Sequence, residues 1–248
     1  MGPALAAIGF GLVAAVIASG IRATRSAIRA RSPLAVRIEE VVGDGWALVL
    51  PHGLKLPPAP TEPDMVGSRP VHDLLHRAGA VDHFDSAHRV VIENVSSDHL
   101  RIVDMPARLC ERTDPLAGTL ITCPSGGAAE ALLLMYELDE PTPVAWEWKD
   151  DCGPRIRSGQ RPYFELGDIR LQPGEAIPLI VVARTVRHFC RWQLDAVVEV
   201  RRRRRTVPLL DGERSFRVTG TPVLGFERDL HWAWYDAGAP DFKPPPEL

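Results

Sequence analysis

Hydrophobic and polar residues alternate in short runs through most of the second half of the chain. Alternation with a period of two places successive side chains on opposite faces of a strand, so that one face covers a core. In residues 189–200, every second position from Trp192 to Val200 falls on an apolar face, and Gln193, Asp195 and Glu199 fall on the other face. The pattern predicts strands at residues 88–95, 99–105, 118–123, 131–138, 176–186 and 189–200.

Turn-forming residues separate these runs, including Ser-Ser-Asp and Pro-Gly-Glu. Several short strands at this spacing predict a mainly β domain over residues 88–236, an immunoglobulin-like or related antiparallel β-sandwich. No long helical pattern alternates with the strands, and no GxGxxG motif is present. Both observations argue against a Rossmann or α/β-barrel enzyme.

Residues 34–87 carry three different patterns. The segment VRIEEVVGDGWALVL alternates around Gly-Asp-Gly, which predicts a hairpin. A proline-rich connector follows, and residues 71–80 then show the period of one short helix. Its apolar stripe, formed by Val71, Leu74, Leu75 and Ala78, is expected to dock on the sandwich and leave the helix's histidines in solvent.

The first 21 residues predict a transmembrane helix, because 4–21 contain no charged side chain and are just long enough to span a bilayer. A basic juxtamembrane linker, residues 22–33, follows, with Arg22, Arg25, Arg29 and Arg31. Positive charge after the apolar stretch argues against a cleaved signal peptide. It also predicts a single-pass plasma-membrane protein whose soluble domain is cytoplasmic, with these arginines near anionic lipid.

Small residues recur every fourth position within the span, at Ala7, Gly11, Ala15 and Ser19. Small-xxx-small spacing lets two transmembrane helices approach closely, so a homodimer through this helix is one interpretation. The alternative is a lipid-facing face of small residues, because alanine and glycine are abundant throughout the segment.

Between Leu34 and Asp236 the chain carries NVSSDHLRI, DPLAGTLI, ELDEP, a Tyr163-Phe164 pair, LQPGE, Trp192 and FRVTG. In these motifs it resembles a family of uncharacterised single-pass actinobacterial membrane proteins with a β-sandwich domain. The motifs are turn and core signatures without a catalytic constellation. The resemblance implies a fold and a membrane topology and no activity.

Net charge is −3, so the chain as a whole has no attraction to nucleic acid, and no nucleic-acid partner is expected. One local exception is the run Arg201, Arg202, Arg203, Arg204 and Arg205. It lacks the interleaved aromatic residues of single-strand binders and belongs to no recognition helix. The sequence predicts an exposed hairpin end that contacts anionic lipid or an acidic partner, with a solvated loop as the alternative.

Half of the eight histidines lie between residues 71 and 88. His72 and His76 have the spacing that puts two imidazoles on one helical face, as in zinc proteases, with Asp73 where those carry glutamate. His83 is the third ligand predicted for a possible zinc ion; Asp82, Asp85 and His88 are the other available donors. The competing interpretation is a surface helix without metal, and no other cofactor is expected.

The four cysteines, Cys110, Cys123, Cys152 and Cys190, lack zinc-ribbon spacing. In the cytoplasm they are expected to be thiols, whereas an exported domain could form two disulfides. The sequence thus predicts a non-enzymatic, membrane-anchored binding or scaffold module with an unknown protein partner and a proline-rich tail at 237–248. The alternatives are a metal-dependent hydrolase using HDLLH and an exported, disulfide-containing envelope protein.

Overall fold

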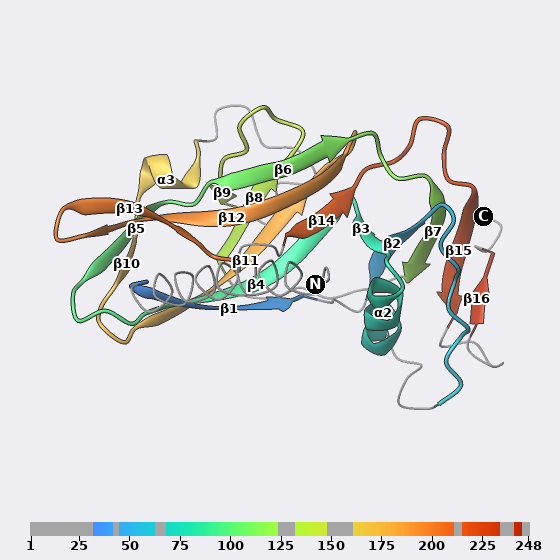
Figure 1. The fold of residues 1–248 in the computed structure, drawn as a ribbon, viewed down its shortest axis with the longest axis horizontal. Coiled ribbons are helices and arrows are strands. Elements are labelled where there is room, and N and C mark those ends of the chain that lie inside the picture. Colours follow the sequence, from blue (N-terminus) through green and yellow to red (C-terminus); the bar gives the residue numbers. More distant parts are fainter. Residues whose placement is uncertain are drawn as a thin grey trace, which may run out of the picture.

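The computed structural model describes residues 32–41, 45–62, 68–123, 132–147, 161–210, 215–233 and 241–244. In these ranges the fold is mainly β, with two sheets and two helices (Figure 1). The smaller sheet has five strands. In spatial order they are β1 (Leu34–Glu40), β4 (Asp85–Asn94), β11 (Ala176–Arg184), β8 (Leu132–Glu137) and β9 (Trp146–Glu147).

The larger sheet is organised around β12 (Phe189–Val200), which pairs with four other strands. In order it contains β10 (Ile169–Leu171), β5 (Leu100–Asp104), β12, β14 (Phe216–Thr219), β3 (Val81–His83), β2 (Trp46–Pro51), β7 (Gly118–Cys123), β15 (Arg228–Ala233) and β16 (Asp241–Lys243). β6 (Ala107–Thr113) and β13 (Arg203–Pro208) also pair with β12. The pairing register shifts twice along β12, between Arg191 and Trp192 and between Val197 and Val198. Such irregularities bend a strand, which lets this long strand pair with different partners along its length.

The main core, which we call the sandwich core, lies where the five-stranded sheet faces β5, β6, β12 and β14. Trp192 of β12 is fully buried there, with its ring centroid 4.6 Å from that of Phe216 and 6.3 Å from that of Tyr136. The Tyr136 hydroxyl donates a 2.7 Å hydrogen bond to the backbone oxygen of Met105. Burial of large aromatic area, with the hydroxyl satisfied, stabilises the two-sheet arrangement.

A second core forms where helix α2 (Ser68–Arg77) packs beside β2, β7 and β15, at the opposite end of the long axis from the β12–β13 hairpin (Figure 1). Val71 and Leu75 on α2 are fully buried, and Trp232 joins them from β15. The indole nitrogen of Trp46 donates to the backbone oxygen of Ser68 at 3.1 Å, which fixes the start of the helix. The other helix, α3 (Tyr163–Leu166), is a single turn beside the sandwich core.

The six predicted strands are confirmed with small shifts at their ends, and α2 lies close to the predicted helix. The predicted hairpin at residues 36–50 is wrong: β1 pairs with β4 in one sheet, and β2 pairs with β3 and β7 in the other. The sandwich is also not purely antiparallel, because β8–β11, β3–β14 and β7–β15 are parallel pairs. The boundary expected at residue 87 falls within β4, and both predicted parts contribute to both sheets.

The predicted membrane span at 1–21, its small-residue spacing, and Arg22, Arg25, Arg29 and Arg31 lie outside the described residues. In the part of the chain that the structure describes, no helix has both the length and the apolar composition needed to cross a bilayer. The predicted proline-rich tail is partly a strand, since β16 pairs with β15 and Phe242 lies 4.8 Å from Trp232, ring to ring.

Candidate functional site

The arginine run forms a tight hairpin with an unfavourable turn. β12 ends at Val200, β13 begins at Arg203, and those two residues pair, so Arg201 and Arg202 alone make the turn. Their φ angles are 49° and 65°, in the left-handed region that hairpin turns of this kind usually fill with Asn-Gly. An L-residue other than Gly, Asn or Asp pays about 1–2 kcal/mol there. Two arginines are therefore kept at the tip against the local backbone preference.

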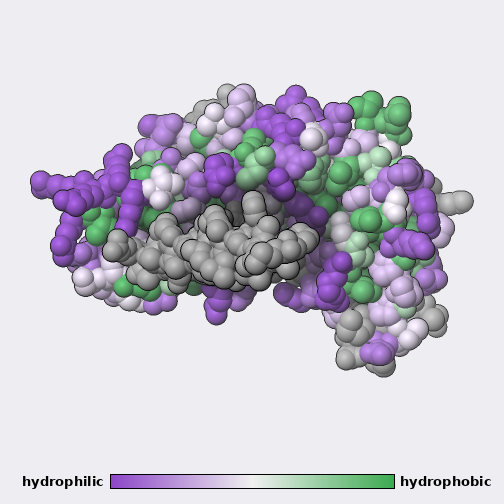
Figure 2. Space-filling view, in the orientation of Figure 1, coloured by the Kyte–Doolittle hydropathy of each residue, from purple (hydrophilic) through white to green (hydrophobic). Residues whose placement is uncertain are grey.

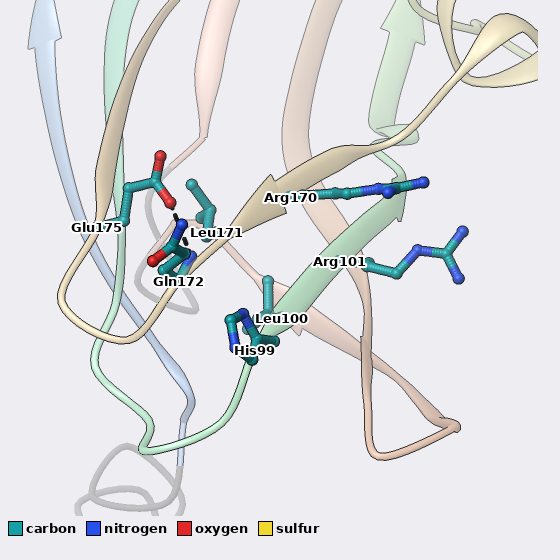
Figure 3. Close-up of a pocket in the computed structure, with 7 residues that line it drawn as sticks. All are labelled: His99, Leu100, Arg101, Arg170, Leu171, Gln172 and Glu175. Carbon is teal, nitrogen blue, oxygen red and sulfur yellow. Dashed lines mark hydrogen bonds between the residues drawn. The ribbon is translucent and has the colours of Figure 1, made fainter.

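Ion pairs connect the hairpin to a row of charged side chains that crosses the four strands β13, β12, β5 and β10. On β12, Glu199 accepts hydrogen bonds from Arg204 of β13 at 3.1 Å and from Arg101 of β5 at 3.0 Å. Asp168 joins Arg101 to Arg170 of the edge strand β10. Figure 3 shows the side chains of Arg101 and Arg170 extending side by side in the same direction. We call this region, Arg101, Arg170 and Arg201–Arg205, the arginine end.

Its carboxylates are held ionised by the arginines. The hydrogen bond from Arg204 lowers the pKa of Glu199. Desolvation acts to raise the pKa of Asp168, but hydrogen bonds from Arg101 and Arg170 outweigh it and lower that pKa. These exposed pairs add little stability, so their main effect is to orient the guanidinium groups.

A cavity of about 580 Å³ opens beside this row, at the edge of the larger sheet. Its lining residues are His99, Leu100, Arg101, Arg170, Leu171, Gln172 and Glu175 (Figure 3). The carboxylate of Glu175 accepts the backbone N–H of Gln172 at 2.7 Å and so belongs to the turn after β10. The sequence alone did not identify Arg101 and Arg170, because only strand pairing brings them beside the hairpin.

The chain enters the sandwich at this same end. Leu34 opens β1 opposite Asn94, and the backbone oxygen of Pro33 accepts the N–H of Val95 at 2.9 Å. The loop that follows carries Asp98, whose carboxylate lies 3.0 Å from the Arg201 guanidinium. Pro33, the last residue of the predicted basic linker, therefore lies at the end of the sandwich that carries the arginine hairpin.

A second group of side chains lies at the other end of the molecule. His72 and His76 of α2 have ring centroids 4.4 Å apart, and both face Asp82 of β3. The Oδ1 of Asp82 is 3.2 Å from Nε2 of His76 and 3.8 Å from Nε2 of His72. We call these three residues the His–Asp cluster. Burial acts to raise the pKa of Asp82, but hydrogen bonds with both histidines dominate and lower it.

His83 and His88, also considered as metal ligands, lie elsewhere. Strand alternation directs His83 away from Asp82, and its Nε2 is 3.1 Å from the Thr221 hydroxyl. His88 stacks on Phe216 with ring centroids 3.8 Å apart. Burial lowers the pKa of each to about 4, so both are neutral at pH 7. The residue that completes the His72–His76 pair is thus Asp82, not His83.

The expectation that the helix's histidines face solvent is wrong for His72, which is 3% exposed. Its Nδ1 lies 3.7 Å from Asp73, on the opposite side of the ring from the nitrogen that faces Asp82. A general base would have to reach a water held between His72 and His76. The position of Asp73 therefore disfavours the hydrolase interpretation of HDLLH.

Three of the cysteines are described, and all are free thiols: Cys110 is exposed, and Cys123 and Cys190 are buried. Burial raises the pKa of Cys190, which is the opposite of what a nucleophile requires. The nearby His188 is held by Asp139, with Nδ1 and Oδ1 2.7 Å apart. This region of the described chain thus shows no activated thiol, and Cys152 lies outside the described residues.

Comparison with protein-family models, curated proteins and solved structures finds no match to this chain. The resemblance to an actinobacterial membrane-protein family therefore stays a prediction. The two candidate sites rest on the geometry of the chain itself: the arginine end, and the His–Asp cluster.

Proposed function

We propose that the protein is a non-enzymatic, single-pass plasma-membrane module. Its immunoglobulin-like sandwich lies in the cytoplasm, docks its arginine end on anionic lipid headgroups and holds the opposite end out for a protein partner. One observation carries the proposal: the strained arginine turn, Arg201–Arg202, projects from the same end of the sandwich at which the chain enters from the predicted span.

Chain connectivity favours this orientation. The linker of residues 22–33 can span at most about 40 Å when fully extended, so β1 begins close to the bilayer. If the linker is less than fully extended, the end of the sandwich that carries the β12–β13 hairpin is the part of the fold that lies nearest to the lipid. Tethering makes the contact intramolecular, so that weak attractions suffice to keep it populated.

Electrostatics favours an anionic surface. The hairpin, the cavity and their ion-pair partners bring seven arginines together with four carboxylates. The carboxylates are Asp98, Asp168, Glu175 and Glu199. Figure 2 shows hydrophilic side chains projecting at the end of the molecule where the hairpin lies. Each arginine near a cytoplasmic leaflet adds about 1 kcal/mol of attraction.

The opposite end offers a different surface. Val223 and Leu224 are 100% and 99% exposed at the tip of the loop between β14 and β15. The loop is shaped by a turn in which the Gly225 N–H donates to the Pro222 oxygen at 2.9 Å. Two adjacent, fully exposed aliphatic side chains on this turn form a small apolar patch that a protein partner would cover. Docking of the arginine end keeps this tip away from the membrane.

The test is hydrogen–deuterium exchange of the full chain in nanodiscs of phosphatidylcholine alone or of phosphatidylcholine with phosphatidylserine. Amides of residues 200–206 should exchange more slowly on the anionic discs, and those of residues 221–227 should not change. The variant R202Q/R203Q should lose most of the difference because it removes two charges from the hairpin.

The matched control is R187Q/R228Q, which removes the same charge from exposed arginines away from the arginine end. It should keep the protection seen in the unsubstituted chain. Equal exchange at residues 200–206 on both kinds of disc would exclude docking on anionic lipid.

A further inference from the structure

The His–Asp cluster lies away from the arginine end, where α2 packs beside β3, and lipid docking does not use it. Its three potential donor atoms come from residues with fixed backbone positions. His72 and His76 are one helical turn apart on α2, so their rings share a face. Asp82 sits on β3, which is paired on both sides, with Leu48 of β2 and Val218 of β14 opposite it.

The spacing of the donors suits a small metal ion. All three donor atoms lie within 4.8 Å of one another, and two of the separations are 3.2 and 3.8 Å. Ligands about 2.0–2.1 Å from a tetrahedral zinc ion are about 3.3 Å apart, so a contraction of at most about 1.5 Å between any two donors closes the site. Rotation of the imidazoles supplies movement of that size without a change in the backbone.

The three donors face one another, and one side of the cluster is open to solvent. Nδ1 of His72 faces away from Asp82, and the Asp73 carboxylate lies 3.7 Å from it, so Nε2 is the nitrogen that His72 presents to the other two donors. The side chain of His72 is 4% exposed, that of Asp82 is 11% and that of His76 is 21%. Solvent therefore reaches one side of the cluster, where water can complete the coordination.

We propose that Nε2 of His72, Nε2 of His76 and a carboxylate oxygen of Asp82 bind one divalent transition-metal ion of the zinc type. Two imidazoles and one carboxylate are donors that zinc accepts, whereas imidazole nitrogens are poor ligands for calcium and magnesium, which prefer oxygen. The bound ion joins α2 to β3, and its binding stabilises the packing of the helix beside β2. The role is structural and does not depend on membrane docking.

The test uses the full chain in detergent, without a histidine tag, stripped with a chelator and dialysed. Zinc is then titrated against a chromophoric competitor, and the melting temperature is followed before and after addition. We expect one zinc ion per chain and a melting temperature that rises on addition. H76Q and D82N should each bind zinc at least about 10-fold more weakly. H76Q changes a partly exposed side chain, so it keeps a folded reference if D82N fails to fold.

The matched control is H83Q, at the next position of β3, whose side chain contacts Thr221 instead. It should bind zinc like the unsubstituted chain. Cobalt(II) in place of zinc gives a second readout, since a tetrahedral site shows intense visible absorption that H76Q should remove. The absence of equimolar zinc binding by the unsubstituted chain, or binding unaltered in H76Q, would overturn the proposal and leave the cluster as an ion-paired part of the helix packing.

Discussion

Replacing the arginine turn by R201N/R202G is expected to stabilise the fold and weaken membrane docking at the same time. Arg201 and Arg202 have positive φ angles, and Asn-Gly is the pair that a two-residue hairpin turn of this geometry prefers. A change that improved folding and impaired a binding function would separate the two roles of the same residues. Such opposite effects are common where a local backbone rule is broken for function.

The stability effect can be estimated from the turn. Relief of two left-handed L-residues is worth about 2 kcal/mol at the lower end of the range. Glycine returns about 0.5–1 kcal/mol through the entropy of the unfolded chain. The exposed Arg201–Asp98 ion pair, with its 3.0 Å contact, contributes a few tenths of a kcal/mol. The net gain in the free energy of unfolding is therefore about 1 kcal/mol.

The docking effect follows from the lost charges. Loss of two arginines, at about 1 kcal/mol each, should lower the equilibrium constant for docking by about 10-fold to 30-fold. The lower figure is the more appropriate one, because Asp98 already neutralises part of the Arg201 charge. Urea unfolding in detergent measures the first effect, and exchange of the hairpin amides on anionic nanodiscs measures the second. R187Q/R228Q serves again as the charge-matched control.

A fall in the urea midpoint of R201N/R202G would refute the claim that the arginine turn is strained. Unchanged protection of residues 200–206 on anionic discs would refute the assignment of these arginines to lipid. The two results are independent, so either half of the reasoning can fail alone.

Three further predictions concern stability and its dependence on pH. Y136F removes the buried hydrogen bond to the Met105 oxygen and should cost about 1–2 kcal/mol in urea unfolding; a cost near zero would mean that this bond contributes nothing. Burial opposes ionisation of Asp139, but the Val186 N–H and hydrogen bonds with His188 and Thr185 lower its pKa below 3.8. The stability that Asp139 contributes is therefore complete above about pH 4 and lost as pH falls through the lowered pKa, and D139N should flatten this acid-induced loss in urea midpoints measured between pH 5 and 2. Burial lowers the pKa of His88 from 6.5 to about 4. Between pH 6.5 and 4 the imidazole is therefore protonated in the unfolded chain and neutral in the folded chain, so the free energy of unfolding falls by up to about 3 kcal/mol as the pH drops through this range. Burial lowers the pKa of His83 to about 4 as well, so His83 adds a similar share, and H88Q should remove about half of the total slope in the same assay; an unchanged slope would contradict the assignment.

Strands could be predicted from the sequence, but their partners could not. The alternation in residues 189–200 directs Trp192 and its neighbours into a core, and β12 has the bounds expected. The Gly-Asp-Gly signal near residue 44 predicted a hairpin because turn preferences are local. The pairing of β1 with β4 and of β2 with β3 depends on contacts between segments far apart in sequence, which a local pattern does not encode.

The candidate sites divide in the same way. Five consecutive arginines had to be exposed, and the spacing of His72 and His76 had to place both on one helical face, because helix and strand periods follow from covalent geometry. The sequence offered Asp82 as one of several donors and predicted His83 instead. Only the position of β3 beside α2 selected Asp82, and the same strand alternation turned His83 away.

The sequence by itself thus determined six of the strands, the place of one short helix and the exposure of the arginine run, since these follow from side-chain periodicity and the cost of burying charge. The tertiary structure decided that Arg101 and Arg170 lie beside the hairpin, that this end receives the chain from residue 33, and that two histidines meet Asp82. Those juxtapositions come from packing two sheets around one core and a helix around another, which is a property of the whole chain and of no single segment.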